Sequence, residues 1–130
     1  MSNIVGILLA AGSSRRFGSD KRWHRLAAGV AAAQEAKGWL VALADMPSIA
    51  AASYRAVLDA LVAGAGIARP MLDGQVGHPV GFAAAYRDGL LSLTGDRGGK
   101  AIIAAHPAAV ADCPVSDPGI LFDIDTPAAA

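Results

Sequence analysis

The chain has 130 residues, a length typical of one compact domain, and its 54% hydrophobic residues are ample for a core. Its 11 basic and 11 acidic residues give a formal net charge of zero, which excludes a chain-wide field for nucleic acid or an acidic membrane surface. The single cysteine, Cys113, excludes an intrachain disulfide and a cysteine-rich metal site, and it fits a reducing, cytoplasmic compartment. Any recognition of an anion must therefore be local.

The first part of the chain alternates apolar runs with a helical pattern. Residues 3–10 form a continuous apolar run before a glycine-rich turn, which predicts a central parallel strand covered on both faces rather than a signal peptide. Residues 22–37 have helical spacing and stop at Gly38, and residues 39–44 repeat the pattern of a buried strand. Both strands thus deliver polar residues at their carboxyl ends.

The second part continues the alternation. Ser48 is a candidate N-cap for a helix that ends at Gly64 or Gly66. Extended segments at 67–71 and 76–80 flank Asp73-Gly74, a hairpin-type turn signal. The remaining predicted elements are helices over 82–93 and 101–105 and strands over 110–115 and 120–124.

The alternation of strands and helices predicts an α/β fold, with three layers (α/β/α) around a mostly parallel, Rossmann-like nucleotide-binding sheet. No repeat or Ser/Pro-rich linker divides the chain, so residues 1–130 are expected to form a single domain. In open α/β sheets, ligands bind beyond the carboxyl ends of the strands. The loops after Ala10, Ala44 and Ile124 are therefore expected to converge on one site.

The first of these loops carries the chemistry of a phosphate site. Residues 9–21 read Leu-Ala-Ala-Gly-Ser-Ser-Arg-Arg-Phe-Gly-Ser-Asp-Lys. Small residues after a strand let backbone N–H groups approach phosphate oxygens, and the two arginines and the lysine add charged donors. The segment matches neither the P-loop nor the Gly-x-Gly-x-x-Gly pattern. It predicts a cradle for a triphosphate, the alternative being a solvated basic turn.

Further polar motifs follow at the ends of later elements. Asp45-Met46-Pro47 ends a predicted strand, and a carboxylate there can hold Mg²⁺, the cofactor that we expect. His78 lies within Gly-His-Pro, whereas the other histidines carry no motif. The Gly-Asp-Arg-Gly-Gly-Lys turn at 95–100 precedes a helix, and a solvated connection is an equally good interpretation.

The last motif, Asp123-Ile124-Asp125-Thr126-Pro127, offers a second carboxylate for the same metal. Asp123 and Asp125 are alternative candidates for this second carboxylate. The sequence does not choose between them.

Together the five motifs resemble the molybdenum cofactor cytidylyltransferase-like (MobA-like NTP transferase) family, and they follow the family's order across nearly the whole chain. The family's signature is Leu-Ala-Ala-Gly-x-Ser-x-Arg-x-Gly-x-x-Lys, with methionine commoner where Phe17 stands. Its positions are occupied here by Leu9, Ala10, Ala11, Gly12, Ser14, Arg16, Gly18 and Lys21.

The resemblance implies transfer of CMP from CTP to molybdopterin, with release of pyrophosphate. It assigns catalysis to Arg16, Lys21 and Asp45, and Mg²⁺ binding to Asp45, Asp123 and Asp125. Ala11 favours CTP, because guanylyltransferases of the superfamily tend to have glycine there. The resemblance also implies a molybdenum enzyme as recipient of the cofactor. The residues expected to bind nucleotide or acceptor are Leu9, Ala10, Ala11, Gly12, Ser13, Ser14, Lys21 and His78.

The chain departs from the family by its short connection between Lys21 and Asp45. Family members place further strand and helix units there, so we expect one or two β/α units, on the order of 30 to 60 residues, to be missing near residues 26–28. The sheet would thus be shortened after the first βα unit, in a region that helps to form the nucleobase pocket. Three alternatives stay open: a GTP-using molybdenum cofactor guanylyltransferase, a sugar-phosphate nucleotidyltransferase and a non-catalytic cofactor carrier.

Overall fold

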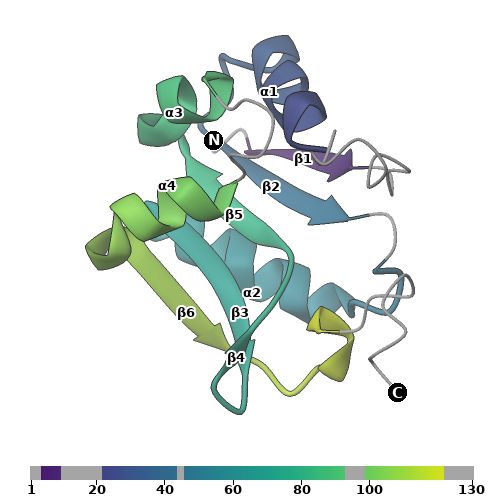
Figure 1. The fold of residues 1–130 in the computed structure, drawn as a ribbon. Coiled ribbons are helices and arrows are strands. Elements are labelled where there is room, and N and C mark those ends of the chain that lie inside the picture. Colours follow the sequence, from purple (N-terminus) through teal and green to yellow (C-terminus); the bar gives the residue numbers. More distant parts are fainter. Residues whose placement is uncertain (1–3, 10–21, 44–45, 93–98, 122–130) are drawn as a thin grey trace.

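A sheet of six strands forms the middle layer of the structure, a computed structural model that describes residues 4–9, 22–43, 46–92 and 99–121 (Figure 1). The strands are β1 (Ile4–Leu9), β2 (Gly38–Leu43), β3 (Ile67–Leu72), β4 (Gln75–Val76), β5 (Val80–Ala83) and β6 (Val110–Pro114). The helices are α1 (Arg22–Ala32), α2 (Ala51–Val62), α3 (Arg87–Leu91) and α4 (Gly99–Ala105), with short 3-10 turns η2 (Ala84–Tyr86), η3 (Pro107–Ala109) and η4 (Pro118–Ile120).

The strand order is β1-β2-β5-β3, with β4 and β5 along one side of β3 and β6 along the other. β1 pairs with β2 and β3 pairs with β6 in parallel, whereas β5 runs antiparallel to both β2 and β3. Four strands, β1, β2, β3 and β6, therefore point the same way. The prediction of a mostly parallel, Rossmann-like α/β sheet is confirmed.

Helices cover both faces of the sheet, which gives the three predicted layers (Figure 1). On one face, α2 packs through Val57 and Leu61 against Ala68 of β3. The other face carries α1, α3 and α4. Neighbouring residues of β3 divide between the two sides: Ile67 joins one core cluster and Ala68 the other, as the alternation of side chains along a strand requires.

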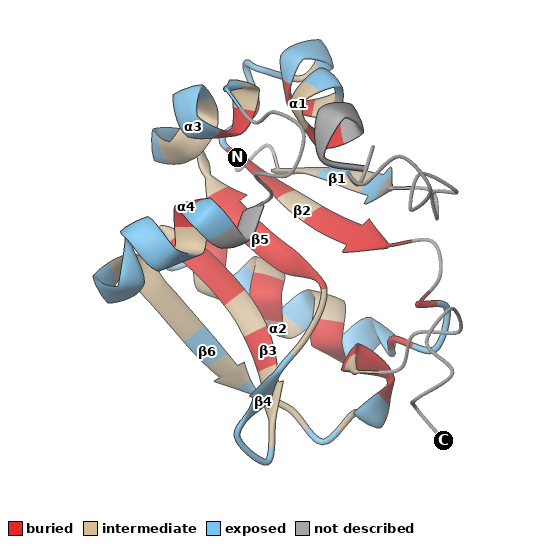
Figure 2. Cartoon of the chain, in the orientation of Figure 1, coloured by how far each residue is buried: buried red, intermediate tan, exposed pale blue. Residues whose placement is uncertain are grey.

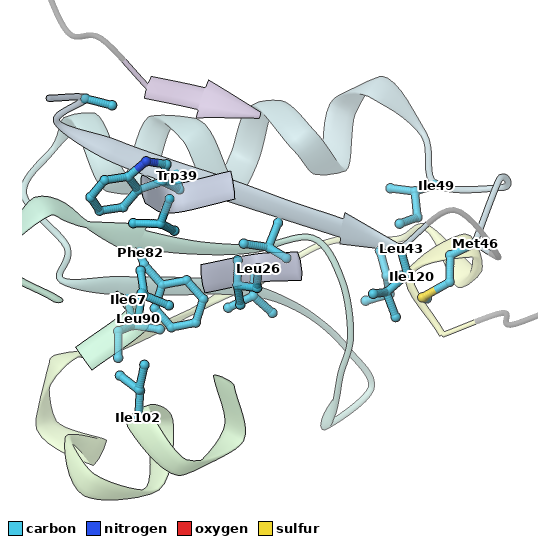
Figure 3. Packing of buried hydrophobic residues seen from close by; sticks show 14 residues of the cluster. Leu26, Trp39, Leu43, Met46, Ile49, Ile67, Phe82, Leu90, Ile102 and Ile120 are labelled. Atoms are coloured by element: carbon cyan, nitrogen blue, oxygen red, sulfur yellow. The ribbon is translucent and has the colours of Figure 1, made fainter. Parts of the chain in front are cut away.

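The larger core cluster lies under α1, α3 and α4 and holds the biggest buried side chains (Figures 2 and 3). Trp39 of β2 is completely buried and Phe82 of β5 nearly so, and the two are register partners in the sheet. Full burial of such a side chain stabilises the fold by about 1.5–3 kcal/mol. Leu90 of α3 and Ile102 of α4 belong to the same cluster and cover it on the side of these helices.

In the described residues between β1 and its direct neighbour β2, the chain forms the helix α1, which runs through residues 26–28 without a break. The prediction that a segment is missing there, relative to the family, stays a prediction. Among the described strands, however, β1 stands at the end of the sheet, and Leu8 is 69% exposed. The prediction of a central strand is therefore wrong for the described sheet, because no described strand covers the outer edge of β1.

Several predicted boundaries change for identifiable reasons. α1 ends at Ala32, not at residue 37, and the Trp39 indole N–H donates to the Ala33 carbonyl oxygen just beyond it (3.1 Å). The predicted helix over 82–93 begins too early, because Phe82 is held in β5. The predicted strand from Ile120 begins instead in the 3-10 turn η4.

The extended segment predicted over 76–80 is divided in the structure, because β4 ends at Val76 and β5 begins at Val80. The remaining elements agree more closely with the predictions. β3 and β4 form the predicted hairpin, in which Asp73 (φ 50°) and Gly74 (φ 83°) adopt the positive φ angles of a type I′ turn. β2, α4 and β6 lie within a residue or two of the expected bounds. Within the ranges given above, no helix has the length and apolar character needed to cross a membrane.

Candidate functional site

The carboxyl ends of β1 and β2 lie side by side at one edge of the sheet. In the parallel register, Leu9, the last residue of β1, is the partner of Leu43, the last residue of β2. The predicted phosphate loop starts directly after Leu9, and Asp45 comes two residues after Leu43. Two segments with predicted chemistry thus leave the sheet from adjacent positions, as the rule for open α/β sheets predicts.

The chain after β2 is anchored to the core on its way to α2. The Met46 N–H donates to the Leu43 carbonyl oxygen (3.1 Å), and Met46 and Ile49 are both buried. These two side chains gather with Leu43 and Ile120 at one end of the core cluster (Figure 3). Residues 46–49, directly after Asp45 in the sequence, are therefore held between a buried strand end and a buried contact with η4.

η4 is fixed against this segment by the carboxylate of Asp117. Its Oδ2 accepts hydrogen bonds from the Ala50 N–H (2.8 Å) and the Ser53 hydroxyl (2.8 Å), and its Oδ1 accepts one from the Gly119 N–H (2.9 Å). Ser53 is the buried polar side chain of α2. Ala50 is the N-cap residue of α2 and has no side-chain oxygen, so Asp117 supplies the capping acceptor from 67 residues away.

The same carboxylate replaces the cap predicted at Ser48. Ser48 lies two residues before the observed N-cap, Ala50, so the prediction that it caps this helix is wrong. The backbone of Ser48 packs directly against η4 instead. The approach is so close that a Cβ added at Gly119 would overlap the Ser48 carbonyl oxygen. Only a residue without a side chain allows this approach.

His78 also contacts η4. Its backbone N–H donates to the Ile120 carbonyl oxygen (3.1 Å), and the His78–Pro79 peptide bond is cis. A Cβ added at the preceding Gly77 would overlap the same carbonyl oxygen. We use the name η4 junction for this meeting of residues 46–50, 77–79 and 117–121. In this junction, the residues that follow Asp45 and the residues around His78 both contact the segment that precedes Asp123.

The hydrogen bonds to Asp117 also set its charge state. The Ala50 N–H is the main cause that holds the pKa of the Asp117 carboxyl below its ordinary value of 3.8. Burial is the next-largest influence and raises this pKa, and the Ser53 hydroxyl and the Gly119 N–H lower it. Because the folded-state pKa is depressed, ionised Asp117 stabilises the fold above pH 3.8. That stabilisation is lost as the pH falls through the folded pKa.

We expect Asp117→Asn to lower the free energy of unfolding by about 2 kcal/mol at pH 7. Each carboxylate oxygen accepts from an N–H, so whichever way the amide turns, its NH₂ group faces a donor. Urea unfolding at pH 7 and at pH 3.5 measures the effect, which should shrink at the lower pH. Asp112→Asn is the control, since Asp112 makes an exposed ion pair with Arg69 (2.7 Å) and its loss should cost under about 1 kcal/mol. Equal effects of the two substitutions would contradict this role of Asp117.

Most predicted site residues lie outside the described residues, and two are described: Leu9 at the end of β1 and His78 in the η4 junction. The turn at 95–98 lies outside them as well. Over the described ranges, no group of three His, Cys, Asp or Glu side chains is placed to hold a metal ion. The residues that lie outside are Ala10, Ala11, Gly12, Ser13, Ser14, Arg16, Lys21, Asp45, Asp123 and Asp125.

Comparison with known proteins identifies the family. The sequence profile of the MobA-like NTP transferase domain matches residues 23–110, well over half of the chain. The chain belongs to the MobA-like NTP transferase domain family. The matched segment begins after the predicted phosphate loop and ends before Asp123. It covers the chain from α1 to the start of β6, including Asp45 and His78. Membership supports a nucleotidyltransferase with a nucleoside triphosphate as substrate.

Solved structures similar to this MobA-like NTP transferase domain agree with its fold. The Rv0371c homolog from Mycobacterium sp. strain JC1 aligns with a TM-score of 0.63 and 19% identity over 88% of this chain and 86% of its own. Rv0371c from Mycobacterium tuberculosis H37Rv has a TM-score of 0.60 and 21% identity, with 88% of each chain covered. The same protein in complex with manganese has a TM-score of 0.59 and 21% identity, over 88% of this chain and 89% of its own. A search of curated proteins finds no match to the chain.

Proposed function

We propose that this MobA-like NTP transferase domain transfers CMP from CTP to the phosphate of molybdopterin and releases pyrophosphate. The observation that carries the proposal is the parallel pairing of Leu9 with Leu43, which starts the glycine-rich loop and the Asp45 segment from adjacent points of one sheet edge. The η4 junction supports it, because it ties the chain that leads to Asp123 and Asp125 to the residues directly after Asp45. Family membership supplies the reaction class.

In the proposed reaction, an oxygen of the acceptor phosphate attacks the α-phosphorus of CTP in line. A new P–O bond forms as the bond to the β-bridging oxygen breaks, and pyrophosphate leaves with that electron pair. Little covalent chemistry is needed from the protein, so positioning and charge stabilisation carry the rate. The backbone N–H groups of residues 11–14 bind phosphate oxygens, and Arg16 and Lys21 neutralise the charge that develops on the leaving group.

The donor set that we assign to the metal consists of carboxylates, Asp45 with Asp123 or Asp125. Oxygen ligands of this kind suit Mg²⁺, which takes one or two carboxylates and fills its other positions with phosphate oxygens and water. When bound, the ion would withdraw charge from the triphosphate. Rv0371c, a structural neighbour, forms a complex with manganese, and we extend the use of a divalent cation to this chain as a proposal.

His78 belongs to the acceptor side of the proposed site. The structure holds its backbone against η4, next to the chain that leads to the predicted metal ligands. We therefore assign it to contact with the molybdopterin-type acceptor. Transfer of the product to a molybdenum enzyme completes the proposed role, and the open alternatives are the guanylyltransferase, the sugar-phosphate nucleotidyltransferase and the carrier.

Pyrophosphate release distinguishes these alternatives. The purified protein is incubated with Mg²⁺, with CTP or GTP as donor, and with molybdopterin or a hexose 1-phosphate as acceptor. We expect release with CTP and molybdopterin, and none without the metal. Release with GTP would identify a guanylyltransferase, release with the hexose phosphate a sugar-phosphate enzyme, and binding of molybdopterin without release a carrier.

A further inference from the structure

A cavity lies at the end of the sheet opposite the proposed nucleotide site. It has a volume of about 830 Å³, in the usual range for small-molecule sites, and is formed where the carboxyl end of α1 meets α3 and the start of β1. Val5 of β1 lines it, four residues before Leu9, so about 13 Å of strand separate this cavity from the proposed phosphate loop. The other lining residues are Ala31, Ala32, Ala33, Gln34, Glu35, Ala36 and Arg87.

Arg87 gives this cavity its recognition chemistry. Its Nε atom is buried and has no hydrogen-bond partner, which is costly for a charged guanidinium. The guanidinium carbon lies 5.9 Å from the ring centroid of Trp39, a side chain that is itself completely buried and hydrogen-bonded to Ala33. Arg87 lines the cavity with its guanidinium held against the Trp39 ring, and a guanidinium fork matches the two oxygens of a carboxylate.

The lining of the cavity also contains groups that favour positive charge. Glu35 belongs to it, and α1 ends there with its last carbonyl groups, where the helix carries a partial negative charge. α1 has no basic residue in its last turn to balance that charge. A phosphate would be attracted by Arg87 but repelled by Glu35 and the carboxyl end of α1, so an anion alone fits poorly. A molecule that carries both a negative and a positive charge fits the whole lining.

We propose that this cavity binds a free amino acid. The carboxylate pairs with Arg87 and the ammonium group with Glu35 and the carboxyl end of α1. The small apolar walls from Val5 and the alanines accept the side chain. This inference does not depend on the proposed transferase reaction, because none of the residues involved belongs to the predicted nucleotide site.

The test is an NMR titration of the full ¹⁵N-labelled chain with each of the twenty amino acids up to about 10 mM, enough to detect millimolar affinity. The Trp39 indole N–H signal reports binding, because this group donates to a cavity residue, Ala33. The chain has two tryptophans, so Trp23→Phe assigns the signal. The amino acid that binds is then compared with its decarboxylated amine and its deaminated acid.

We expect at least one amino acid to bind, and each analogue that lacks one charge to bind at least about tenfold more weakly. Arg87→Lys and Glu35→Gln should each raise the dissociation constant by about tenfold. Arg55→Lys, an exposed arginine of α2 on the other face of the sheet, should leave it unchanged. Since Glu35 is exposed, Glu35→Gln keeps the test valid if Arg87→Lys unfolds. Binding of no amino acid, equal binding of the deaminated acid, or unchanged affinity in Glu35→Gln would overturn the proposal.

Discussion

Replacing Lys21 with alanine is expected to reduce the rate of pyrophosphate release by about 10²–10³-fold. In the proposed reaction, negative charge builds on the β- and γ-phosphates as the bond to the α-phosphorus breaks. A lysine ammonium is a compact charge that stabilises this transition state more than the bound triphosphate. Lys21 directly precedes α1 in the sequence, and its replacement by alanine removes one positive charge.

The measurement is the steady-state rate with saturating CTP, molybdopterin and Mg²⁺, together with the free energy of unfolding in urea. Lys37→Ala is the matched control, because Lys37 is an exposed lysine in the turn before β2. Both variants should unfold like the parent chain, and only Lys21→Ala should lose activity. Near-normal turnover in Lys21→Ala would contradict the assignment of this lysine to the triphosphate.

Gly119→Ala is expected to lower the free energy of unfolding by about 3 kcal/mol and to reduce turnover as well. The added methyl group would overlap the Ser48 carbonyl oxygen and come within 2.9 Å of the Asp117 Oδ1 atom. Backbone atoms cannot turn away as a side chain can, so η4 must move off the start of α2. The hydrogen bonds of Asp117 to Ala50 and Ser53 would then be strained or lost.

Gly6→Ala is the control for this substitution. Gly6 lies in β1, where an added Cβ meets no atom within 4 Å, so its replacement should change the free energy of unfolding by under about 1 kcal/mol. Thermal and urea unfolding measure the first effect, and pyrophosphate release at a temperature where both variants stay folded measures the second. A folded Gly119→Ala variant with full activity would show that the η4 junction does not position the predicted metal ligands.

The order of the elements was predictable because each carries a local pattern. Continuous apolar runs predict β1 and β2, and the Asp73-Gly74 pair predicts the turn between β3 and β4 through its positive φ angles. The predicted helix from Phe82 failed for a nonlocal reason. Phe82 pairs with Trp39 and Ile67 in the sheet, and no pattern within its own segment reveals those partners.

The position of β1 was mistaken for a similar reason. An apolar run predicts burial on both faces, but it does not say how many neighbours the strand has in the sheet. In the described sheet β1 has one, β2, and Leu8 is largely exposed. The family resemblance predicts missing units near residues 26–28, and an edge position of β1 is what their loss would produce.

In the candidate site, too, local motifs were predictable and contacts between distant parts of the chain were not. The sequence motifs predicted which segments carry the chemistry, and the parallel register of β1 and β2 brings the starts of two of them together. Asp117 was missed, although Asp117-Pro118-Gly119 is a turn signal. Its partners Ala50 and Ser53 are 67 and 64 residues away, and such distant partners cannot be read from local spacing. Arg87 was missed because its role depends on Trp39 and the end of α1.

Calorimetric titration of the purified chain with CTP and with GTP, each in the presence of Mg²⁺, tests the nucleotidyltransferase proposal most directly. We expect CTP to bind more tightly than GTP, and we expect the binding to weaken when Mg²⁺ is removed or when Asp45 is replaced by asparagine. Tighter binding of GTP would contradict the choice of base. Failure to bind either triphosphate would contradict the proposed transferase reaction and favour the cofactor carrier.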